Sequence, residues 1–421
     1  MGSACRAVPA WLVRLGPWVF VLALALHVVT IVLWPNAHWN LIDMRTYRGG
    51  AQHLVDGQSL YNGPVFLTLN FIYPPFAAIL FLPLTLLSTS VDKWLTFTGE
   101  LALLYFAGRH CWRRMTTARG GDLVKLSLLT AGLGLWMDPI RITTYLGQIN
   151  TLLLALVVAD LYRTRGRFGG VGLGIAAGIK LTPLIFLPFL LVTRRFRDAA
   201  VAVGVFVATA LVSLAVTPSN TVRYWIDGAF HNAGRITDPG SVSNQSINGA
   251  LIRIAGHGHG ETLLWLACAG LVAVAGIGLA ALAYHRNQSL LALALVGMTG
   301  SAVSPYSWNH HWVWVFGLLL WLLALGGRKA YLAAGVLYLA CLGFLDAYPP
   351  PSDTWHIPLS GWQYLPVNGW PRLLLDNTWI LIYLGVILVT AWWLRSGSTG
   401  SEGHDIGDTA ELRARTPAPA A

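Results

Sequence analysis

Long apolar runs constrain this chain more than any other feature of its sequence. About thirteen of them lie between residues 11 and 394, and a helix needs roughly 20 apolar residues to cross a bilayer. Only 11% of the 421 residues are charged, whereas soluble domains carry about 25%. The runs predict an all-α polytopic membrane protein with a single transmembrane domain over residues 1–395.

Basic residues mark the side of the membrane on which each loop is predicted to lie. Arginine and lysine cluster at residues 109–125, 163–167 and 194–197, and such clusters favour the cytoplasmic side. These loops account for the net charge of +10 without a nucleic-acid partner. The pattern puts both termini in the cytoplasm and predicts about 12 transmembrane helices. One run between residues 72 and 109 therefore does not cross.

Three long loops are predicted on the outer side, at about residues 35–71, 218–261 and 346–376. The tail at 396–421 is rich in Gly, Ser, Thr, Pro and Ala, and this composition predicts disorder. Residues 169–192 begin and end near basic clusters. Both ends of this segment are therefore expected on the same side of the membrane. Two short half-helices, broken near Lys180 and Pro183, would return the chain to that side. Broken helices are tolerated where they line a cavity.

Unusual polar residues gather on the predicted outer side. Charged groups at membrane depth are costly, and several that converge usually line a functional cavity. The candidates are Asp43, Arg141, Gln148, Asn150, Asn244, Gln245, Asn248, His310 and His311, together with Lys180 in the broken segment. We predict that they surround one site.

Several of these residues have structural alternatives. Asp43 in IDMRTY has the position of a helix N-cap, and Arg141 has the length to reach lipid headgroups. Lys180 interrupts an otherwise apolar run, so an anionic partner is the better hypothesis. Adjacent His310 and His311 fit an aromatic belt, a packing role or a phosphate contact.

The sequence lacks the motifs of several other enzyme classes. No P-loop, GxGxxG or GxSxG pattern occurs, which argues against nucleotide-driven transport and serine hydrolysis. The four cysteines have no metal-ligand spacing. We predict no cofactor, no metal site and no nucleic-acid partner.

Six motifs resemble those of one enzyme family and occur in its order over about residues 40–315. They are IDMRTY, YPPFAAILFLPL from Tyr73, GQINTLLL from Gly147, KLTPLIFLPF from Lys180, SNQSINGALIR from Ser243 and SPYSWNHHWVW from Ser304. The chain resembles glycosyltransferase family 87, of GT-C architecture. The resemblance is greatest to its actinobacterial polyprenyl-phosphate-mannose-dependent α-(1,2)-mannosyltransferases of phosphatidylinositol mannoside and lipoglycan synthesis.

The resemblance implies a lipid-linked sugar phosphate as donor, a glycolipid as acceptor and a reaction on the outer face of the plasma membrane. Asp43 matches the catalytic aspartate, which would take the proton of the acceptor hydroxyl. Lys180, His310 and His311 match positions near the donor phosphate. Gln148, Asn150, Asn244 and Gln245 match polar motifs that line the same cavity, where they are candidates for contacts to sugar hydroxyls or to the phosphate.

This chemistry is consistent with the predicted residues. An inverting transfer needs one base and stabilisation of the departing phosphate, whereas a retaining double displacement needs a second carboxylate. Among the outer carboxylates, only Asp43 stands near the end of an apolar run within a motif. Lysine or protonated histidine at the phosphate could take the place of a metal.

Other functions stay open at this point. A variant of the same mechanism transfers arabinofuranose or another pentose from a polyprenyl phosphate. A lipid or sugar transporter, or a flippase, would also use a broken helix with a buried charge. A scaffold subunit without activity is the third possibility.

Overall fold

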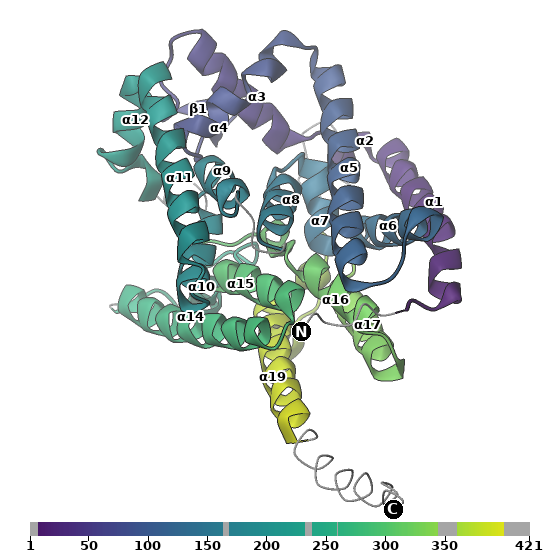
Figure 1. Cartoon of the computed structure of the whole chain (residues 1–421). Coiled ribbons are helices and arrows are strands. Elements are labelled where there is room, and N and C mark those ends of the chain that lie inside the picture. The colour runs from purple at the N-terminus through teal and green to yellow at the C-terminus, as the bar shows by residue number, and fades with distance from the viewer. Residues whose placement is uncertain (1–6, 163–167, 232–237, 259, 344–359, 400–421) are drawn as a thin grey trace, which may run out of the picture.

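The computed structural model describes residues 7–162, 168–231, 238–258, 260–343 and 360–399, and this part of the chain is mostly helical (Figure 1). The first helices run over Ala10–Leu33 (α1), Pro35–His38 (α2), Ile42–Val55 (α3), Pro75–Leu80 (α4), Thr89–Met115 (α5), Gly120–Leu135 (α6), Asp138–Leu146 (α7), Asn150–Leu161 (α8), Val171–Ile179 (α9) and Phe186–Val192 (α10). The later helices run over Phe196–Val216 (α11), Pro218–Trp225 (α12), Ile247–Ala255 (α13), Glu261–His285 (α14), Ser289–Val303 (α15), Val315–Leu325 (α16), Arg328–Ala340 (α17), Trp370–Leu375 (α18) and Thr378–Thr399 (α19).

Short 3-10 helices and one hairpin complete the described structure. The 3-10 helices are Leu82–Leu86 (η1), Thr182–Ile185 (η2), Ala229–His231 (η3), Asn309–Trp312 (η5) and Trp362–Tyr364 (η6). The hairpin pairs Pro64–Phe66 (β1) with Leu69–Asn70 (β2) in antiparallel register. An added Cβ at Gly49 would overlap the carbonyl of Val65, and one at Gly50 would overlap the ring of Phe71. This glycine pair therefore lets the segment from β1 to Phe71 close onto α3.

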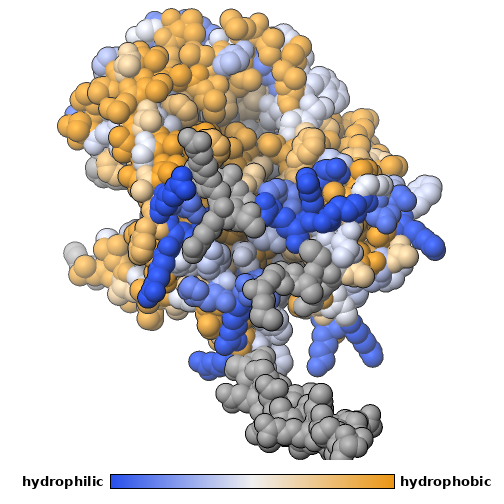
Figure 2. Space-filling view, viewed as in Figure 1, coloured by the Kyte–Doolittle hydropathy of each residue, from blue (hydrophilic) through white to orange (hydrophobic). Residues whose placement is uncertain are grey.

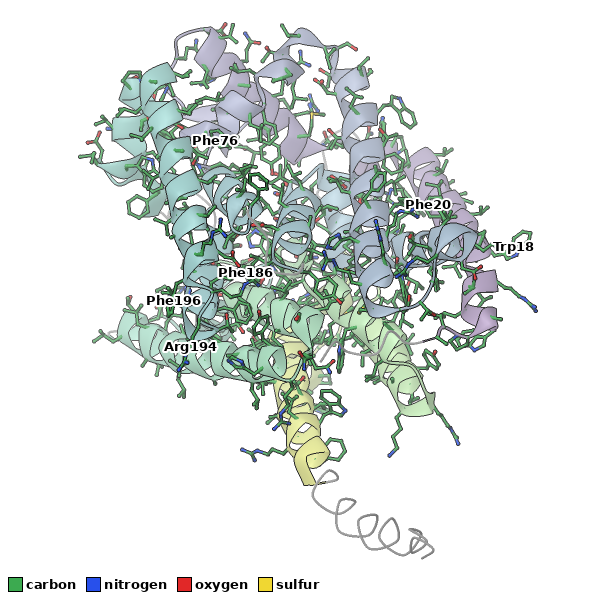
Figure 3. All side chains as sticks on the ribbon, in the orientation of Figure 1. Trp18, Phe20, Phe76, Phe186, Arg194 and Phe196 are labelled. Atoms are coloured by element: carbon green, nitrogen blue, oxygen red, sulfur yellow. The ribbon has the colours of Figure 1, made fainter. Side chains whose placement is uncertain are left out.

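Within the described ranges, four helices are long and apolar enough to cross a membrane: α1, α11, α14 and the part of α19 up to Ser396. Shorter apolar helices lie between them. Their outward side chains form a large hydrophobic surface, and hydrophilic residues gather in the middle and lower right of the same view (Figure 2). Trp18 on α1 is 75% exposed and points away from the bundle, whereas Phe186 is buried among the helices (Figure 3). The prediction of a mostly helical membrane protein is thus confirmed, as far as the presence of long apolar helices shows it.

The apolar run at residues 72–88 forms two short pieces rather than one long helix. These pieces are α4 and η1, and Ser88 then caps α5 by accepting a hydrogen bond from the Val91 amide. The 27 residues of α5 follow without a break. Neither α4 nor η1 is long enough to cross a bilayer by itself.

The predicted break at Lys180 is confirmed. Helix α9 ends at Ile179, and Lys180 adopts an extended conformation with φ −150° and ψ 134°. The chain then resumes as η2 and α10, with Pro183 inside η2. Because the break turns the backbone out of the helix, Lys180 lies at an end of α9 rather than along its side.

Candidate active site

A cavity of about 350 Å³ lies where α3, the turn between α7 and α8, the break at Lys180 and η5 meet. Its polar lining residues include Asp43, Tyr73, Gln148, Lys180, His310 and His311. Apolar side chains such as Ile42, Leu69 and Trp308 also line it. The volume falls within the range of about 300–1,000 Å³ that small-molecule sites occupy. Five of the predicted site residues therefore lie around one cavity.

Helix α3 brings Asp43 to this cavity. The amide of Leu41 donates to the carbonyl of Tyr145 at 3.2 Å, so the end of α7 holds the residue before α3 in place. Leu41 is the N-cap and has φ 48°, and no side chain caps this helix. Asp43 is the second residue of α3, and the N-cap alternative is therefore wrong.

Gln148 connects Asp43 to two tyrosines. The amide Nε2 of Gln148 donates to Oδ2 of Asp43 at 2.7 Å, and the hydroxyl of Tyr47 donates to Oε1 of Gln148 at 2.7 Å. The Tyr47 and Tyr73 hydroxyls lie 3.1 Å apart. Since Tyr47 donates to the amide oxygen, it directs the amide nitrogen toward the carboxylate.

Burial raises the pKa of Asp43 to about 6, while the hydrogen bond from Gln148 and the charge of Lys180 act against that rise. A carboxylate with a pKa near neutrality is ionised at pH 7 yet holds a proton better than a free aspartate. The same burial raises the pKa of Tyr47. Tyr47 is therefore a hydrogen-bond donor at neutral pH and Asp43 is the group suited to accept a proton.

Lys180 lies beside both α8 and η5. Its Nζ donates to Oδ1 of Asn150 at 3.1 Å and lies 3.0 Å from Nε2 of His311. A lysine ammonium has donors only, so Nε2 of His311 accepts from the charged form. No carboxylate lies within ion-pair distance of Lys180 in the described structure.

The two histidines present different faces to the cavity. Their rings are nearly perpendicular, at 82°, with centroids 4.8 Å apart. His310 stacks on Trp308 at an interplanar angle of 10°. The Nδ1 atoms of both histidines are buried and form no hydrogen bond with any described residue. The pair can therefore offer donors to an oxygen-rich ligand.

Arg141 lies away from this cavity. It is fully buried on α7, donates to the carbonyl of Gly343 at 3.2 Å and packs over the Trp136 ring at 3.8 Å. It does not extend to the surface as lipid snorkelling would require. The structure places it between α7 and the segment after α17.

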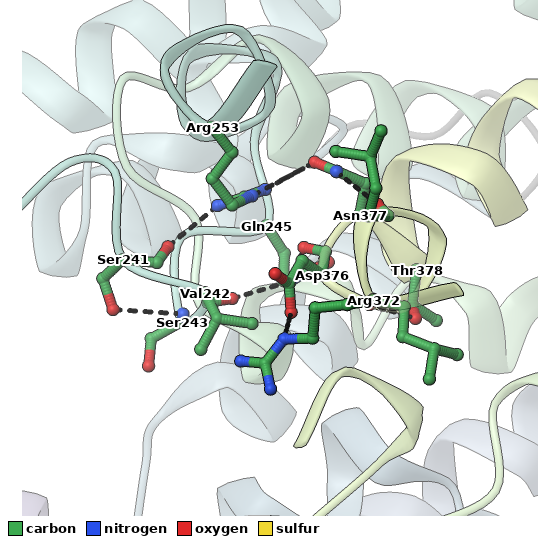
Figure 4. Close-up of polar contacts among 11 residues, drawn as sticks. Ser241, Val242, Ser243, Gln245, Arg253, Arg372, Asp376, Asn377 and Thr378 are labelled. Atoms are coloured by element: carbon green, nitrogen blue, oxygen red, sulfur yellow. Dashed lines mark hydrogen bonds and ion pairs between the residues drawn. The ribbon is translucent and has the colours of Figure 1, made fainter. Parts of the chain in front are cut away.

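Asn244, Gln245 and Asn248 also do not line the cavity. Both asparagines donate to the carbonyl of Pro305, at 3.2 and 3.1 Å, and Gln245 donates to the carbonyl of Asp376 at 2.8 Å. Arg253 ties the same loop to Asn377 at 2.7 Å (Figure 4). These contacts hold the SNQS loop against α19 and the segment before η5.

Asp138 is a buried carboxylate that the sequence predictions did not single out. Its oxygens accept from Asn309 at 3.1 Å, from Ser360 at 2.6 Å and from Gln363 at 3.2 Å. Asn309 directly precedes His310, so Asp138 anchors the histidine segment to residues 360–363. The available signal was its position beside an apolar run, but the following Pro139 made it resemble an ordinary helix start.

Among the described residues, no group of three or more His, Cys, Asp or Glu side chains is arranged to hold a metal ion. Lys180 and the two histidines are the groups beside the cavity that suit an anion. Asp43 is the only carboxylate in the described lining. The site therefore pairs one base with a cluster of nitrogen donors.

Comparisons with known proteins identify a family and several similar proteins. The model of Glycosyltransferase family 87 matches residues 71–305. The chain is 34% identical to a polyprenol-phosphate-mannose-dependent alpha-(1-2)-phosphatidylinositol pentamannoside mannosyltransferase of Mycolicibacterium smegmatis, over 93% of this chain and 94% of that protein. It is 35% identical to a protein of the same name from Mycobacterium tuberculosis, over 86% and 88%.

A third relative, from Mycobacterium tuberculosis, is 31% identical over 77% of this chain and 82% of its own length. It is named as a polyprenol-phosphate-mannose-dependent alpha-(1-2)-phosphatidylinositol mannoside mannosyltransferase. No solved structure matches the chain.

Proposed function

The chain belongs to glycosyltransferase family 87, and we propose that it transfers mannose from polyprenyl-phosphate-mannose to a phosphatidylinositol mannoside or related lipoglycan, forming an α-(1,2) linkage. The observation that carries this proposal is the cavity itself. It has Asp43 on the α3 wall and Lys180, His310 and His311 on the others. A base and an anion-binding cluster that share one cavity fit a transfer from a sugar phosphate.

In the proposed reaction, the acceptor hydroxyl oxygen attacks the anomeric carbon of the mannosyl phosphate. The bond between that carbon and the phosphate oxygen breaks, and its electron pair stays on the polyprenyl phosphate. The hydroxyl proton passes to Asp43. Attack opposite the leaving group inverts a β-linked donor to an α product, and the single lining carboxylate supports this route because a retaining route needs two.

The departing phosphate gains negative charge as the bond breaks. Lys180 supplies a positive charge at the break between α9 and η2, and His311 lies 3.0 Å from it. His310 stands beside His311 on η5. A charged lysine and fixed hydrogen-bond donors in a water-poor site stabilise such charge strongly. We assign the phosphate to these three residues, and Gln148 to the orientation of Asp43.

The acceptor is proposed from the relatives' names. The two relatives named for a pentamannoside acceptor match 93% and 86% of this chain, and one named for a mannoside acceptor matches 77%. A phosphatidylinositol carrying several mannoses is therefore the first acceptor to test. Tyr306 and Thr68 also line the cavity and carry hydroxyl groups suited to a sugar chain.

We also propose a single GT-C membrane domain of about 12 crossings over residues 1–395, with cytoplasmic termini and the cavity open to the outer side of the plasma membrane. The arginine-rich loops support this orientation. The division of residues 72–88 into α4 and η1 also supports it, because neither piece is long enough to cross a bilayer by itself. Helix α19 continues to Thr399, and residues 400–421 lie outside the described structure.

The proposal is tested with purified protein in lipid vesicles. Labelled polyprenyl-phosphate-mannose and polyprenyl-phosphate-arabinose are each offered with a phosphatidylinositol mannoside acceptor. We expect label from the mannosyl donor in an α-(1,2)-linked product, released by an α-(1,2)-mannosidase. Incorporation from the arabinosyl donor alone would overturn the choice of sugar, and movement of an intact lipid without bond formation would indicate a transporter.

A further inference from the structure

Two basic side chains, Arg45 on α3 and Lys93 on α5, lie beside the turn before α3 and have no acidic partner among the described residues. Arg45 donates to Oδ1 of Asn40 at 2.9 Å, and Lys93 on α5 donates to the carbonyl of Trp39 at 2.6 Å. Trp39 and Asn40 are neighbours in the chain, so the two cations approach the same turn. Lys93 lies within electrostatic range of Arg45.

The carboxylate of Asp92, beside Lys93 in the sequence, already has another partner. Asp92 is fully buried and forms an ion pair with Arg48. No ion pair of Arg45 or Lys93 occurs in the described part of the chain. Both cations are half-buried, and two like charges that are partly removed from water repel each other. An anion between them would relieve this cost.

Hydrogen-bonding capacity also remains on both side chains. A guanidinium has five N–H groups and an ammonium has three. The side-chain bonds described above engage one acceptor for each residue. Arg45 also packs over the ring of Phe66 at 4.3 Å, which fixes its guanidinium beside the hairpin. A phosphodiester, with two charged oxygens, matches such a pair of donors.

The surroundings resemble a membrane–water boundary. Trp94 is 59% exposed and lies 4.7 Å from the ring of Trp39. Leu86, just before α5, is 83% exposed, and Arg48 donates to the carbonyl of Leu87 at 2.7 Å. Exposed tryptophan beside exposed leucine is typical of an interface with lipid headgroups. These contacts favour a lipid over a soluble anion.

We infer that Arg45 and Lys93 bind the phosphodiester of the acceptor glycolipid while its mannose chain enters the cavity. This inference rests on the proposed function, because a phosphatidylinositol mannoside carries a phosphodiester between inositol and lipid. Arg45 lies two residues after Asp43 on α3, so the same helix holds the base and one of the two cations. The pair distinguishes a lipid-anchored acceptor from a free mannoside.

A direct binding measurement tests the site. Full-length protein in detergent is titrated with dihexanoyl phosphatidylinositol, and binding is followed by tryptophan fluorescence. We expect the double variant Arg45→Gln/Lys93→Gln to raise the apparent Kd about tenfold, since it removes two charged hydrogen-bond donors. Arg223→Gln is the matched control, because Arg223 on α12 is 51% exposed and pairs with Asp227 beyond the end of that helix. Equal binding by the double variant would overturn the proposal, as would displacement by inorganic phosphate at equal concentration.

A kinetic measurement tests the identity of the lipid. Mannose transfer is measured with a phosphatidylinositol mannoside and with octyl α-mannoside, which has no phosphate. We expect the ratio of their KM values to rise about tenfold in the double variant and to recover in part with Arg45→Lys/Lys93→Arg. An unchanged ratio would refute the acceptor assignment. Failure of the wild-type protein to use either acceptor would refute the proposed function and leave the binding result standing.

Discussion

Asp43, which is half-buried in the cavity wall, and Asp138, which is fully buried, are two carboxylates with opposite surroundings. Burial raises the pKa of each to about 6. Asp138 accepts hydrogen bonds from Asn309, Ser360 and Gln363 and does not line the cavity, whereas the described bond of Asp43 is the one from Gln148. A raised pKa therefore does not identify a base by itself. Open acceptor capacity facing a cavity is what separates the two residues.

The largest expected effect is that of Asp43→Asn on mannose transfer. The substitution keeps the size of the side chain and removes its ability to take a proton. We expect kcat to fall about 10³-fold, with little change in the midpoint of thermal unfolding. Steady-state kinetics and a thermal melt on the same preparation check both parts. Retained activity would show that Asp43 is not the base.

Lys180→Met is expected to lower the rate of mannose transfer somewhat less than Asp43→Asn does. It removes the positive charge near the departing phosphate and keeps an unbranched apolar side chain. We expect kcat to fall about 10²-fold, measured at saturating donor. Lys125→Met is a suitable control because Lys125 is exposed on α6. Equal losses from both variants would point to a general effect of charge on the protein.

Asp138→Asn is expected to reverse the pattern seen at Asp43. The amide nitrogen of asparagine would face the donors of Asn309, Ser360 and Gln363, which leaves buried groups unpaired. We expect a loss of about 3 kcal/mol of unfolding free energy, with less than about tenfold change in kcat for the molecules that remain folded. Chemical denaturation and active-site titration separate the two quantities. A loss of kcat without a loss of stability would make the two carboxylates alike.

The smallest expected effect is that of Gln148→Leu on the pH dependence of transfer. The hydrogen bond from Gln148 favours the charged form of Asp43, so its loss raises the pKa of that carboxyl. We expect the acidic limb of kcat/KM to move up by about one pH unit, so activity at pH 6.5 falls more than activity at pH 8. Tyr47→Phe should move the acidic limb of kcat/KM in the same direction, but by a smaller amount. A limb that stays in place would show that Gln148 contacts substrate instead.

The sequence predicted the parts of the fold that depend on local pattern. Apolar runs indicated the membrane helices, and Lys180 within such a run indicated the break after α9, which the structure confirms. Asp43, Gln148, Lys180, His310 and His311 were placed at one site because motif order and predicted topology agreed.

Features that depend on contacts between distant segments could not be predicted in the same way. The N-cap reading of Asp43 failed because the Tyr145 carbonyl holds Leu41 at the start of α3. Asn244 contacts Pro305, and Asp138 contacts Gln363, across separations that no local pattern records. The sequence therefore identified residue types suited to the chemistry more readily than it identified which of them face the cavity.

The most direct test of the account is the pH dependence of single-turnover mannose transfer in the wild type and in Asp43→Asn. If Asp43 is the base, the wild-type rate falls tenfold per pH unit as the pH drops below about 6, because protonation of a carboxyl with that pKa removes the acceptor for the proton. The residual rate of Asp43→Asn should then lack this limb. A limb that persists in Asp43→Asn, or a wild-type rate that is flat from pH 5 to 8, would contradict the account.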